Sequence, residues 1–251
     1  MFWRRRRAAR ADEARREADE ASSEAALSEA RSFFDRLLDD DGALTPDGMG
    51  RLLVYINERS EVQSALMSDL WAPMMLALAQ GGNFIAEDKT TLMLHEDEKA
   101  LYDCPAYLLK EVIDRELRGA SQGISVPLGH GVRYRAGAVR GHMVTIGSHW
   151  TDADQGTLTL TDRRLVYHGM RQTIEFPLKR IASLTVYGDA IAVGSTNRKT
   201  NSHFRVGTPE MVAGLIQGAV SHEDIVVIQL RFEEASGSAD RGFEIQKLSG
   251  S

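Results

Sequence analysis

The sequence has little cysteine, no long apolar run and no excess of positive charge. Cys104 is its only cysteine in 251 residues, so no intramolecular disulfide can form, which favours a reducing compartment. No apolar run approaches the roughly 18–20 residues of a membrane span. The net charge of −6 excludes a globally cationic nucleic-acid binder. With 43% hydrophobic and 26% charged residues, the composition is that of a protein of one or two domains with a buried core.

The sequence also lacks the motifs that carry reaction chemistry. Its seven histidines show no H-x-x-x-H or cysteine-paired spacing, which leaves a zinc site without support. It contains no nucleophile elbow, no phosphate-binding glycine loop and no dinucleotide fingerprint. Cys104 would need a base supplied by the fold, so a buried, inert thiol is the favoured interpretation. We therefore expect no metal, no cofactor and no enzymatic activity.

Residues 1–90 are expected to form a helical N-terminal region. Residues 8–38 are rich in Ala, Glu and Arg, and alanines recur at helical spacing from Ala11 to Ala25. This helix either leads into the fold or self-associates, and larger side chains near 27–38 mark where it docks. Phe2 and Trp3 stand beside four arginines, which suits an anionic membrane surface, with a frayed terminus as the alternative. A charged stretch follows, which argues against an export signal.

Local signals divide the rest of this region. Thr45-Pro46-Asp47 predicts a helix start, and Gly81-Gly82 predicts the end of a second helix that Pro73 should kink or restart. The segment 87–103 carries six acids against two lysines but lacks the ligand pattern of an EF-hand. We expect it to be a solvated linker or a strand edge.

From Ile124 onward the periodicity changes from helical to alternating. The strongest stretch is G-T-L-T-L-T-D-R-R-L-V-Y at 156–167, which predicts two strands joined by a turn at Asp162-Arg163. Gly188-Asp189 predicts a further hairpin turn. Thr208-Pro209-Glu210 then begins an amphipathic helix. The fold class is therefore α+β: a helical N-terminal region followed by an antiparallel bent sheet or barrel capped by a helix.

These residues resemble a known family. The stretch at 156–167, I-E-F-P-L-K-R-I at 174–181 and the Gly188-Asp189 turn are similar to bacterial pleckstrin-homology-like proteins of the GRAM type. The stretch at 123–137 is similar to the entry strands of that group, so the resemblance covers about 124–220. It implies a non-enzymatic module that binds phospholipid headgroups or peptides. Lipid-binding members carry a basic cluster in the first hairpin, for which the nearest residues here are Arg133, Arg135 and Arg140.

The charge distribution gives an independent reason to expect an anionic ligand. Residues 131–205 carry 11 Lys and Arg against 5 acids, a local charge of +6 in a chain of net charge −6. Several of these cations fall at predicted turns, where they would form one patch if the turns lie at one end; scattered solubilising charges are the alternative. The candidate ligand-binding residues are Arg133, Arg135, Arg163, Arg164, Arg171, Arg198 and Lys199.

Together these observations predict a helical region (1–90), a sheet domain with a capping helix (91–220) and a C-terminal strand or tail (221–251). The expected function is a cytoplasmic binding module for a protein partner or an anionic phospholipid surface, peripheral at the inner face of the membrane in the second case. The alternative is a protein-interaction adaptor that acts through its N-terminal helices without binding lipid. We expect no nucleic acid partner.

Overall fold

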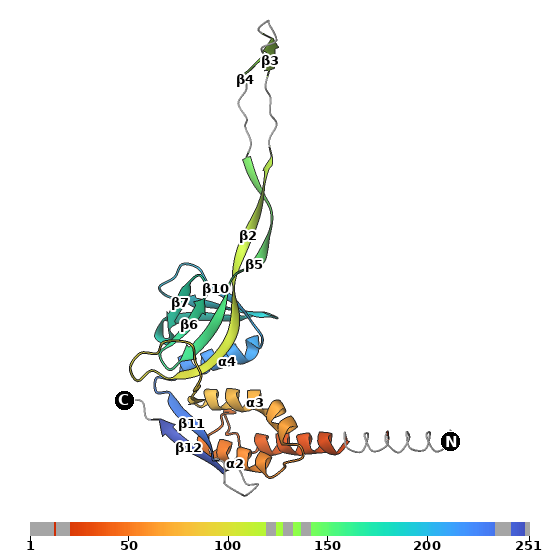
Figure 1. Ribbon diagram of the computed structural model, residues 1–251, viewed down its shortest axis with the longest axis vertical. Helices are drawn as coiled ribbons and strands as arrows, with labels where there is room; N and C mark the ends of the chain where they lie inside the picture. Colours follow the sequence, from red (N-terminus) through yellow and green to blue (C-terminus); the bar gives the residue numbers. More distant parts are fainter. Residues whose placement is uncertain are drawn as a thin grey trace, which may run out of the picture.

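The computed structural model describes residue 13 and residues 21–118, 124–127, 133–136, 142–233 and 242–248, with side chains for 13, 21–113, 147–230 and 246. The chain forms an α+β fold in which helices precede an antiparallel sheet and a further helix follows it (Figure 1). None of the described helices is long and apolar enough to cross a membrane.

The N-terminal helices pack around side chains that the sequence analysis placed at a docking point. Residues 21–35 are helical, followed by α2 (Pro46–Asn57) and α3 (Gln63–Gln80). Phe34 is buried, and the ring of Phe33 stacks on that of Tyr55 with centroids 4.4 Å apart. Thr45 caps α2 as predicted, because its hydroxyl accepts a hydrogen bond of 3.1 Å from the Gly48 N–H. The described part of the first helix therefore docks on α2 and α3. The alanine seam before residue 21 lies largely outside the described residues.

Pro73 does not restart α3, so of the two outcomes predicted for it, a kink or a restart, the restart is wrong. The helix runs without interruption from Gln63 to Gln80 and ends at Gly81, as the glycine pair predicted. Apolar residues on both sides of the proline are buried, including Leu70, Met74 and Leu78. Packing of the turns on either side holds the helix together where Pro73 removes one backbone hydrogen bond.

Seven antiparallel strands form the main sheet, in the order β7-β6-β5-β2-β10-β9-β8. Their bounds are β2 (Ala100–Arg118), β5 (His142–Thr161), β6 (Arg164–Gly169), β7 (Thr173–Pro177), β8 (Ile181–Val186), β9 (Ala190–Ser195) and β10 (Ser202–Val206). A short 3-10 helix, η1 (Leu178–Arg180), joins β7 to β8. The predicted turns at Asp162-Arg163 and Gly188-Asp189 lie between β5 and β6 and between β8 and β9. The sheet curls around an interior in which Phe204 contacts Tyr167 and Phe176.

Helix α4 (Pro209–Ser221) follows the last strand of this sheet and packs on β8, β9, β10 and η1. Its buried face, which includes Val212, Leu215 and Ile216, is the apolar face predicted from the sequence. The same helix also contacts α3, so it lies between the sheet and the N-terminal helices (Figure 1). We call the seven-stranded sheet with α4 the sheet domain.

The C-terminal segment returns to the N-terminal helices. The strand β11 (Val226–Glu233) pairs in parallel with β1 (Asn83–Ile85) and antiparallel with β12 (Gly242–Leu248). Val227 and Ile228 are buried opposite Phe84 and Ile85. We call the N-terminal helices with this three-stranded sheet the helical lobe. Segments that the sequence analysis separated as 1–90 and 221–251 thus share one sheet.

The pair β2–β5 extends well beyond its neighbours and projects from the sheet domain (Figure 1). Strand β10 pairs with β2 only as far as His203 opposite Leu109, and β6 pairs with β5 only as far as Gly169 opposite Gly156. We call residues 110–118 of β2 and 142–151 of β5 the ribbon, and the place where it leaves the sheet domain its foot. The sequence analysis missed β2, which begins 24 residues before Ile124, where strands were first expected.

Candidate functional site

The structure separates the candidate cations into four places. Arg133 and Arg135 lie on β4 (Arg133–Ala136), which pairs with β3 (Ile124–Pro127). Figure 1 shows this pair beyond the end of the ribbon, away from the sheet domain. The side chains of both arginines lie outside the described ones, so the first-hairpin cluster implied by the family resemblance stays a prediction.

Arg164 belongs to the interior of the sheet domain. Its Nε and Nη2 donate to the two carboxylate oxygens of Glu98 at 2.8 and 2.9 Å, and its Nη1 donates to Glu175 at 2.9 Å. The Glu98 side chain is completely buried and also accepts hydrogen bonds from the Thr161 hydroxyl and the His95 N–H. Because the guanidinium is satisfied within the fold, Arg164 is a structural residue and is removed from the ligand-binding set.

The acidic segment 87–103 was expected to be a solvated linker or a strand edge, and buried Glu98 shows that it is not solvated throughout. Burial by itself would raise the pKa of the Glu98 carboxyl, but hydrogen bonds from Arg164, His95 and Thr161, with the charge of Arg164, lower the pKa to about 2. The carboxylate therefore stays ionised inside the protein and fastens this segment to β5 and β6. Several of its other acids, among them Asp97, are exposed as expected.

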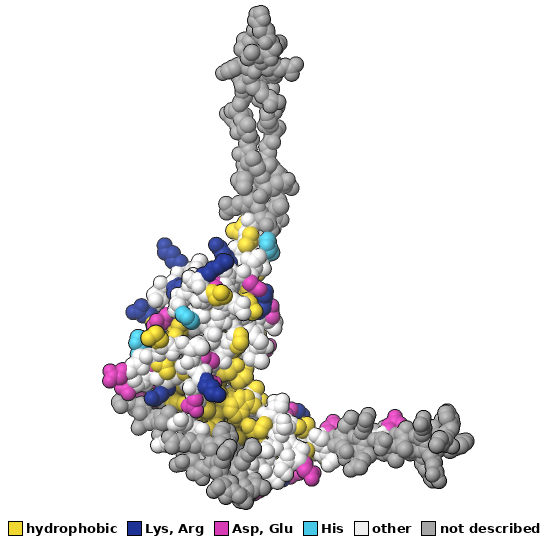
Figure 2. Space-filling view, viewed as in Figure 1, with side chains coloured by type: hydrophobic (Ala, Val, Ile, Leu, Met, Phe, Trp, Pro, Cys, Tyr) yellow, Lys and Arg dark blue, Asp and Glu magenta, His cyan; other side chains and the backbone are white. Residues whose placement is uncertain are grey.

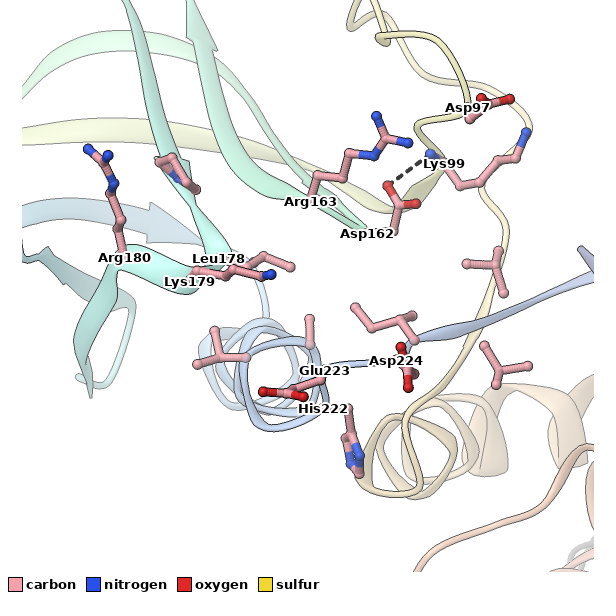
Figure 3. A pocket seen from close by; sticks show the side chains of 16 residues that line it. Asp97, Lys99, Asp162, Arg163, Leu178, Lys179, Arg180, His222, Glu223 and Asp224 are labelled. Atoms are coloured by element: carbon pink, nitrogen blue, oxygen red, sulfur yellow. Dashed lines mark hydrogen bonds between the residues drawn. The ribbon is translucent and has the colours of Figure 1, made fainter. Parts of the chain in front are cut away.

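Arg163 lies at the end of the sheet opposite the ribbon. It occupies the turn between β5 and β6, where Asp162 exchanges hydrogen bonds with Lys99, and its Nη1 donates to the Glu96 carbonyl. The turn borders an open groove of about 1310 Å³ between the sheet domain and the segment that leaves α4. Figure 3 shows Arg163 and Lys99 above this groove, with Glu223 and Asp224 on its α4 side.

The groove carries charge of both signs. Its lining includes four cations and four carboxylates: Lys99, Arg163, Lys179, Arg180, Asp97, Asp162, Glu223 and Asp224. Burial raises the pKa of Asp162, partly offset by the Lys99 N–H bond and by Arg163. With the charges balanced in number, the groove offers no net attraction for an anion.

Arg171 lies beside the foot of the ribbon. It occupies the turn between β6 and β7, and its Nη1 donates to the Ala153 carbonyl of β5 at 3.4 Å. The turn is fastened to β5 by Asp154, a buried carboxylate that accepts hydrogen bonds from the N–H groups of Arg171 and Gln172. The guanidinium is exposed and makes no ion pair with a described residue.

Arg198 and Lys199 approach the foot of the ribbon from its other side. Both are exposed on the loop between β9 and β10, which enters β10 beside Leu109 of β2. The Arg198 guanidinium lies 5.1 Å from the centre of the Phe176 ring, a cation–π contact that leaves its charge unneutralised. Lys110 follows Leu109 on β2 and is also exposed. Two of the three predicted basic turns thus adjoin the same stretch of β2 and β5.

Exposed apolar side chains accompany these cations. Trp150 and Ile113 are each 46% exposed and Val112 is 37% exposed, although all three lie on strands. The Trp150 ring contacts the imidazole of His203, with centroids 4.3 Å apart, and burial lowers the pKa of that imidazole. Figure 2 shows hydrophobic side chains at the foot of the ribbon and Lys and Arg side chains on the adjoining sheet domain. We call Lys110, Arg171, Arg198, Lys199, Ile113 and Trp150 the foot surface.

Sequence reasoning missed Lys110 and Ile113 because β2 was not recognised, and it missed Trp150 although alternating periodicity was predicted from Ile124 onward. The stretch Lys110–Arg118 places charges on both faces, so no alternation marks it as a strand. A tryptophan close to histidines in a region of strand periodicity was the available signal.

The remaining candidate chemistry lies in the interior. Cys104 is buried, and this burial, with a smaller contribution from Asp103, raises the pKa of its thiol to about 12. The described residues contain no group of three or more His, Cys, Asp or Glu side chains placed to hold a metal ion. No protein-family model matches the chain, and no curated protein is significantly similar to it in sequence.

Proposed function

We propose that this chain is a non-enzymatic, pleckstrin-homology-like binding module that docks on an anionic membrane surface from the cytoplasmic side through its foot surface. The observation that carries the proposal is that cations with no ion-pair partner among the described side chains lie near exposed tryptophan and isoleucine where the ribbon leaves the sheet domain.

The charges favour an anionic surface. Lys110, Arg171, Arg198 and Lys199 have no carboxylate partner among the described residues, whereas Arg205 nearby is neutralised by Asp152 and Asp189. Each cation close to an anionic membrane contributes about 1 kcal/mol. Four cations held by the sheet would therefore give a useful affinity that weakens as salt is added.

The apolar side chains favour a membrane over a soluble anion. Tryptophan prefers the headgroup level of a bilayer, where its ring is partly buried and its N–H remains hydrated. Trp150 and Ile113 share one face of the ribbon with Glu111, because Trp150 lies opposite Glu111 and residues 111 and 113 are two apart on β2. Lys110 lies on the other face, so the foot surface extends around both faces of the ribbon. A free phosphate would use the cations and leave these side chains in water.

The architecture supports a binding module of the family that the sequence resembles. A curled antiparallel sheet followed by a covering helix is the arrangement that the resemblance implied. The non-enzymatic part of the proposal is supported by Cys104, since a buried thiol of raised pKa is a poor nucleophile.

Co-sedimentation with vesicles tests this proposal. We expect the full chain to bind vesicles of phosphatidylglycerol and phosphatidylcholine at low salt, more weakly at moderate salt, and not to bind phosphatidylcholine alone. The variant Arg198→Ala/Lys199→Ala should lose about 2 kcal/mol, on the order of 30-fold in affinity. Trp150→Ala should also weaken binding.

A matched control uses cations outside the foot surface. Arg36→Ala/Arg51→Ala removes the same charge from exposed positions in and before α2 and should leave binding nearly unchanged. Equal losses in the two double variants would show a response to net charge alone and would overturn the proposed surface. No binding at either salt concentration would eliminate the membrane as ligand.

A further inference from the structure

The ribbon leaves β2 with an unpaired edge. Strand β10 covers that edge as far as Leu109, and no other described strand pairs with it between Lys110 and Arg118. An open edge presents rows of N–H and C=O groups that another strand can bind. A two-stranded ribbon is at best marginally stable in water, so a further strand would stabilise it.

The edge of β2 is regular, whereas that of β5 is not. Leu108 and Leu109 lie opposite Asp154 and Asp152, which leaves Ala153 as an extra residue on β5. Asp114 and Arg115 lie opposite Gly147 and Thr145, so Ile146 is a second extra residue on β5. Extra residues bend a strand and interrupt its hydrogen-bonding edge. The edge of β2 is therefore the better template.

The ribbon also exposes apolar side chains on both faces. Val112 and Ile113 are consecutive on β2 and point to opposite faces, and both are more than a third exposed. Neither face is covered by a described element. A neighbouring strand would shield both side chains at once, because it adds residues to both faces.

We propose that a second copy of this chain pairs with this edge, β2 against β2, antiparallel, with Ile113 opposite Ile113 of the other copy. The occupant follows from the charge order Lys110-Glu111-Val112-Ile113-Asp114-Arg115-Glu116. In this register Lys110 faces Glu116 and Glu111 faces Arg115, and two-fold symmetry repeats both pairs. Residues 110–116 of the two copies form a four-stranded ribbon, β5-β2-β2-β5, and residues 117–118 of each copy diverge from it, because β10 occupies the edge of the other copy at Leu109.

Other registers lose this complementarity. Side chains alternate between the two faces of a strand, and residues that pair must lie on the same face of the sheet. The centre of a symmetric pairing can therefore move only from one residue to the next. Moving the centre of the pairing from Ile113 to Asp114 places Lys110 opposite Arg118 and Asp114 opposite Asp114 of the other copy. Moving the centre to Val112 leaves Lys110 opposite Asp114 as the only pair of opposite charges. The charge order of residues 110–116 therefore favours one register of pairing between two copies and disfavours strands without complementary charges.

Sedimentation velocity of the full chain over a dilution series tests this inference, which does not depend on the proposed function. We expect a reversible dimer that weakens with salt. Glu111→Arg and Arg115→Glu should each shift the protein to monomer, because each creates two like-charge pairs. The double variant Glu111→Arg/Arg115→Glu should dimerise again, and the two single variants mixed together should form a heterodimer. Glu61→Arg, an exposed reversal between α2 and α3, is the matched control and should remain dimeric.

Two results would overturn the inference. The first is a wild-type chain that is monomeric at every concentration. The second is a dimer that neither single reversal weakens, which would place self-association elsewhere, as at the N-terminal helix. Because the double swap and the mixture restore pairing without restoring the original sequence, misfolding of a single variant cannot imitate the expected pattern.

Discussion

At the scale of single residues, the best-defined interaction is the buried pair of Glu98 and Arg164. Two parallel hydrogen bonds join them, and the His95 N–H and the Thr161 hydroxyl occupy further positions around the carboxylate. A charge removed from water is tolerated only when it is paired and hydrogen-bonded in this way. The pair fastens the segment before β2 to the turn that leads into β6.

This pair predicts a specific loss of stability in acid. The pKa of Glu98 is lowered from 4.5 to about 2, so its ionised form stabilises the native state above its unfolded pKa. That contribution is complete above pH 4.5 and is lost as the pH falls toward about 2. Glu98→Gln leaves Arg164 without its buried counter-ion and should cost about 3–5 kcal/mol near neutral pH. We expect the difference between wild type and variant, measured by urea unfolding, to shrink through this acid range.

The control for this measurement is Glu175→Gln. Glu175 binds the same arginine, but its side chain is 46% exposed, so its removal should cost at most about 1 kcal/mol. If wild type and Glu98→Gln lost stability in parallel between neutral pH and pH 2, the role assigned to the buried carboxylate would be wrong.

At the scale of elements, the contact between α3 and α4 links the two parts of the molecule. Gly218 of α4 lies so close to α3 that a Cβ there would be 2.5 Å from the Ala79 carbonyl oxygen and 2.9 Å from the Ala79 Cβ. Contacts this short do not occur between such atoms, so a side chain at 218 must push the helices apart.

Gly218→Ala should therefore destabilise the protein. In an unobstructed helix the same change is stabilising by roughly 1 kcal/mol, since alanine has the higher helix propensity. Overpacking typically costs about 1–3 kcal/mol, which should reverse the sign. Thermal unfolding of Gly218→Ala measures the net effect, and Gly207→Ala, which lies outside α4 with nothing within 4 Å of the new Cβ, is the control for an unobstructed glycine. A rise in the melting temperature of Gly218→Ala would contradict this view of the interface.

Strands with one buried face could be predicted from the sequence, and β2 could not. Leu158 and Leu160 of β5, and Ile174 and Phe176 of β7, face the interior, so their alternation is visible. Strand β2 contains Pro105, and its ribbon part carries charged residues at positions of both faces. The proline is tolerated because β10 begins to pair with β2 only at Ala106, so the missing N–H adjoins no strand on that side.

The candidate site was partly predictable for a related reason. The turns that carry Arg171, Arg198 and Lys199 were located from local signals, but their shared position depends on which strands flank β2 and β5. That order is set by pairing between distant segments. Arg164 could not be distinguished from Arg163 in the sequence, since only its partner Glu98, 66 residues earlier, removes it from the surface.

At the scale of the whole molecule, the chain divides into a continuous sheet domain and a discontinuous helical lobe. The sheet domain is made from residues 100–221, whereas the lobe combines β1 with β11 and β12 from the other end of the sequence. Phe84 and Ile85 owe part of their burial to Val227 and Ile228. The lobe therefore depends on the last segment for its structure, and the sheet domain does not.

A chain ending at Ser221 tests this division. It keeps every strand of the sheet domain and α4 but loses β11 and β12. We expect amide hydrogen exchange to show lost protection in β1 and α3, because burial of Val227 and Ile228 contributes about 1.5–3 kcal/mol each. Protection in β6, β7 and β9 should be retained. Unchanged protection in the lobe would show that it does not need the C-terminal strands.

The parallel pairing of β1 with β11 also has a consequence for how the protein is made. Ribosomes add about 5–20 residues each second, so Phe84 emerges roughly seven to thirty seconds before the strand that will cover it. During that interval the sheet domain can fold, while the incomplete helical lobe exposes apolar side chains to solvent. Of the two parts, the helical lobe is therefore the one that we expect chaperones to bind during synthesis.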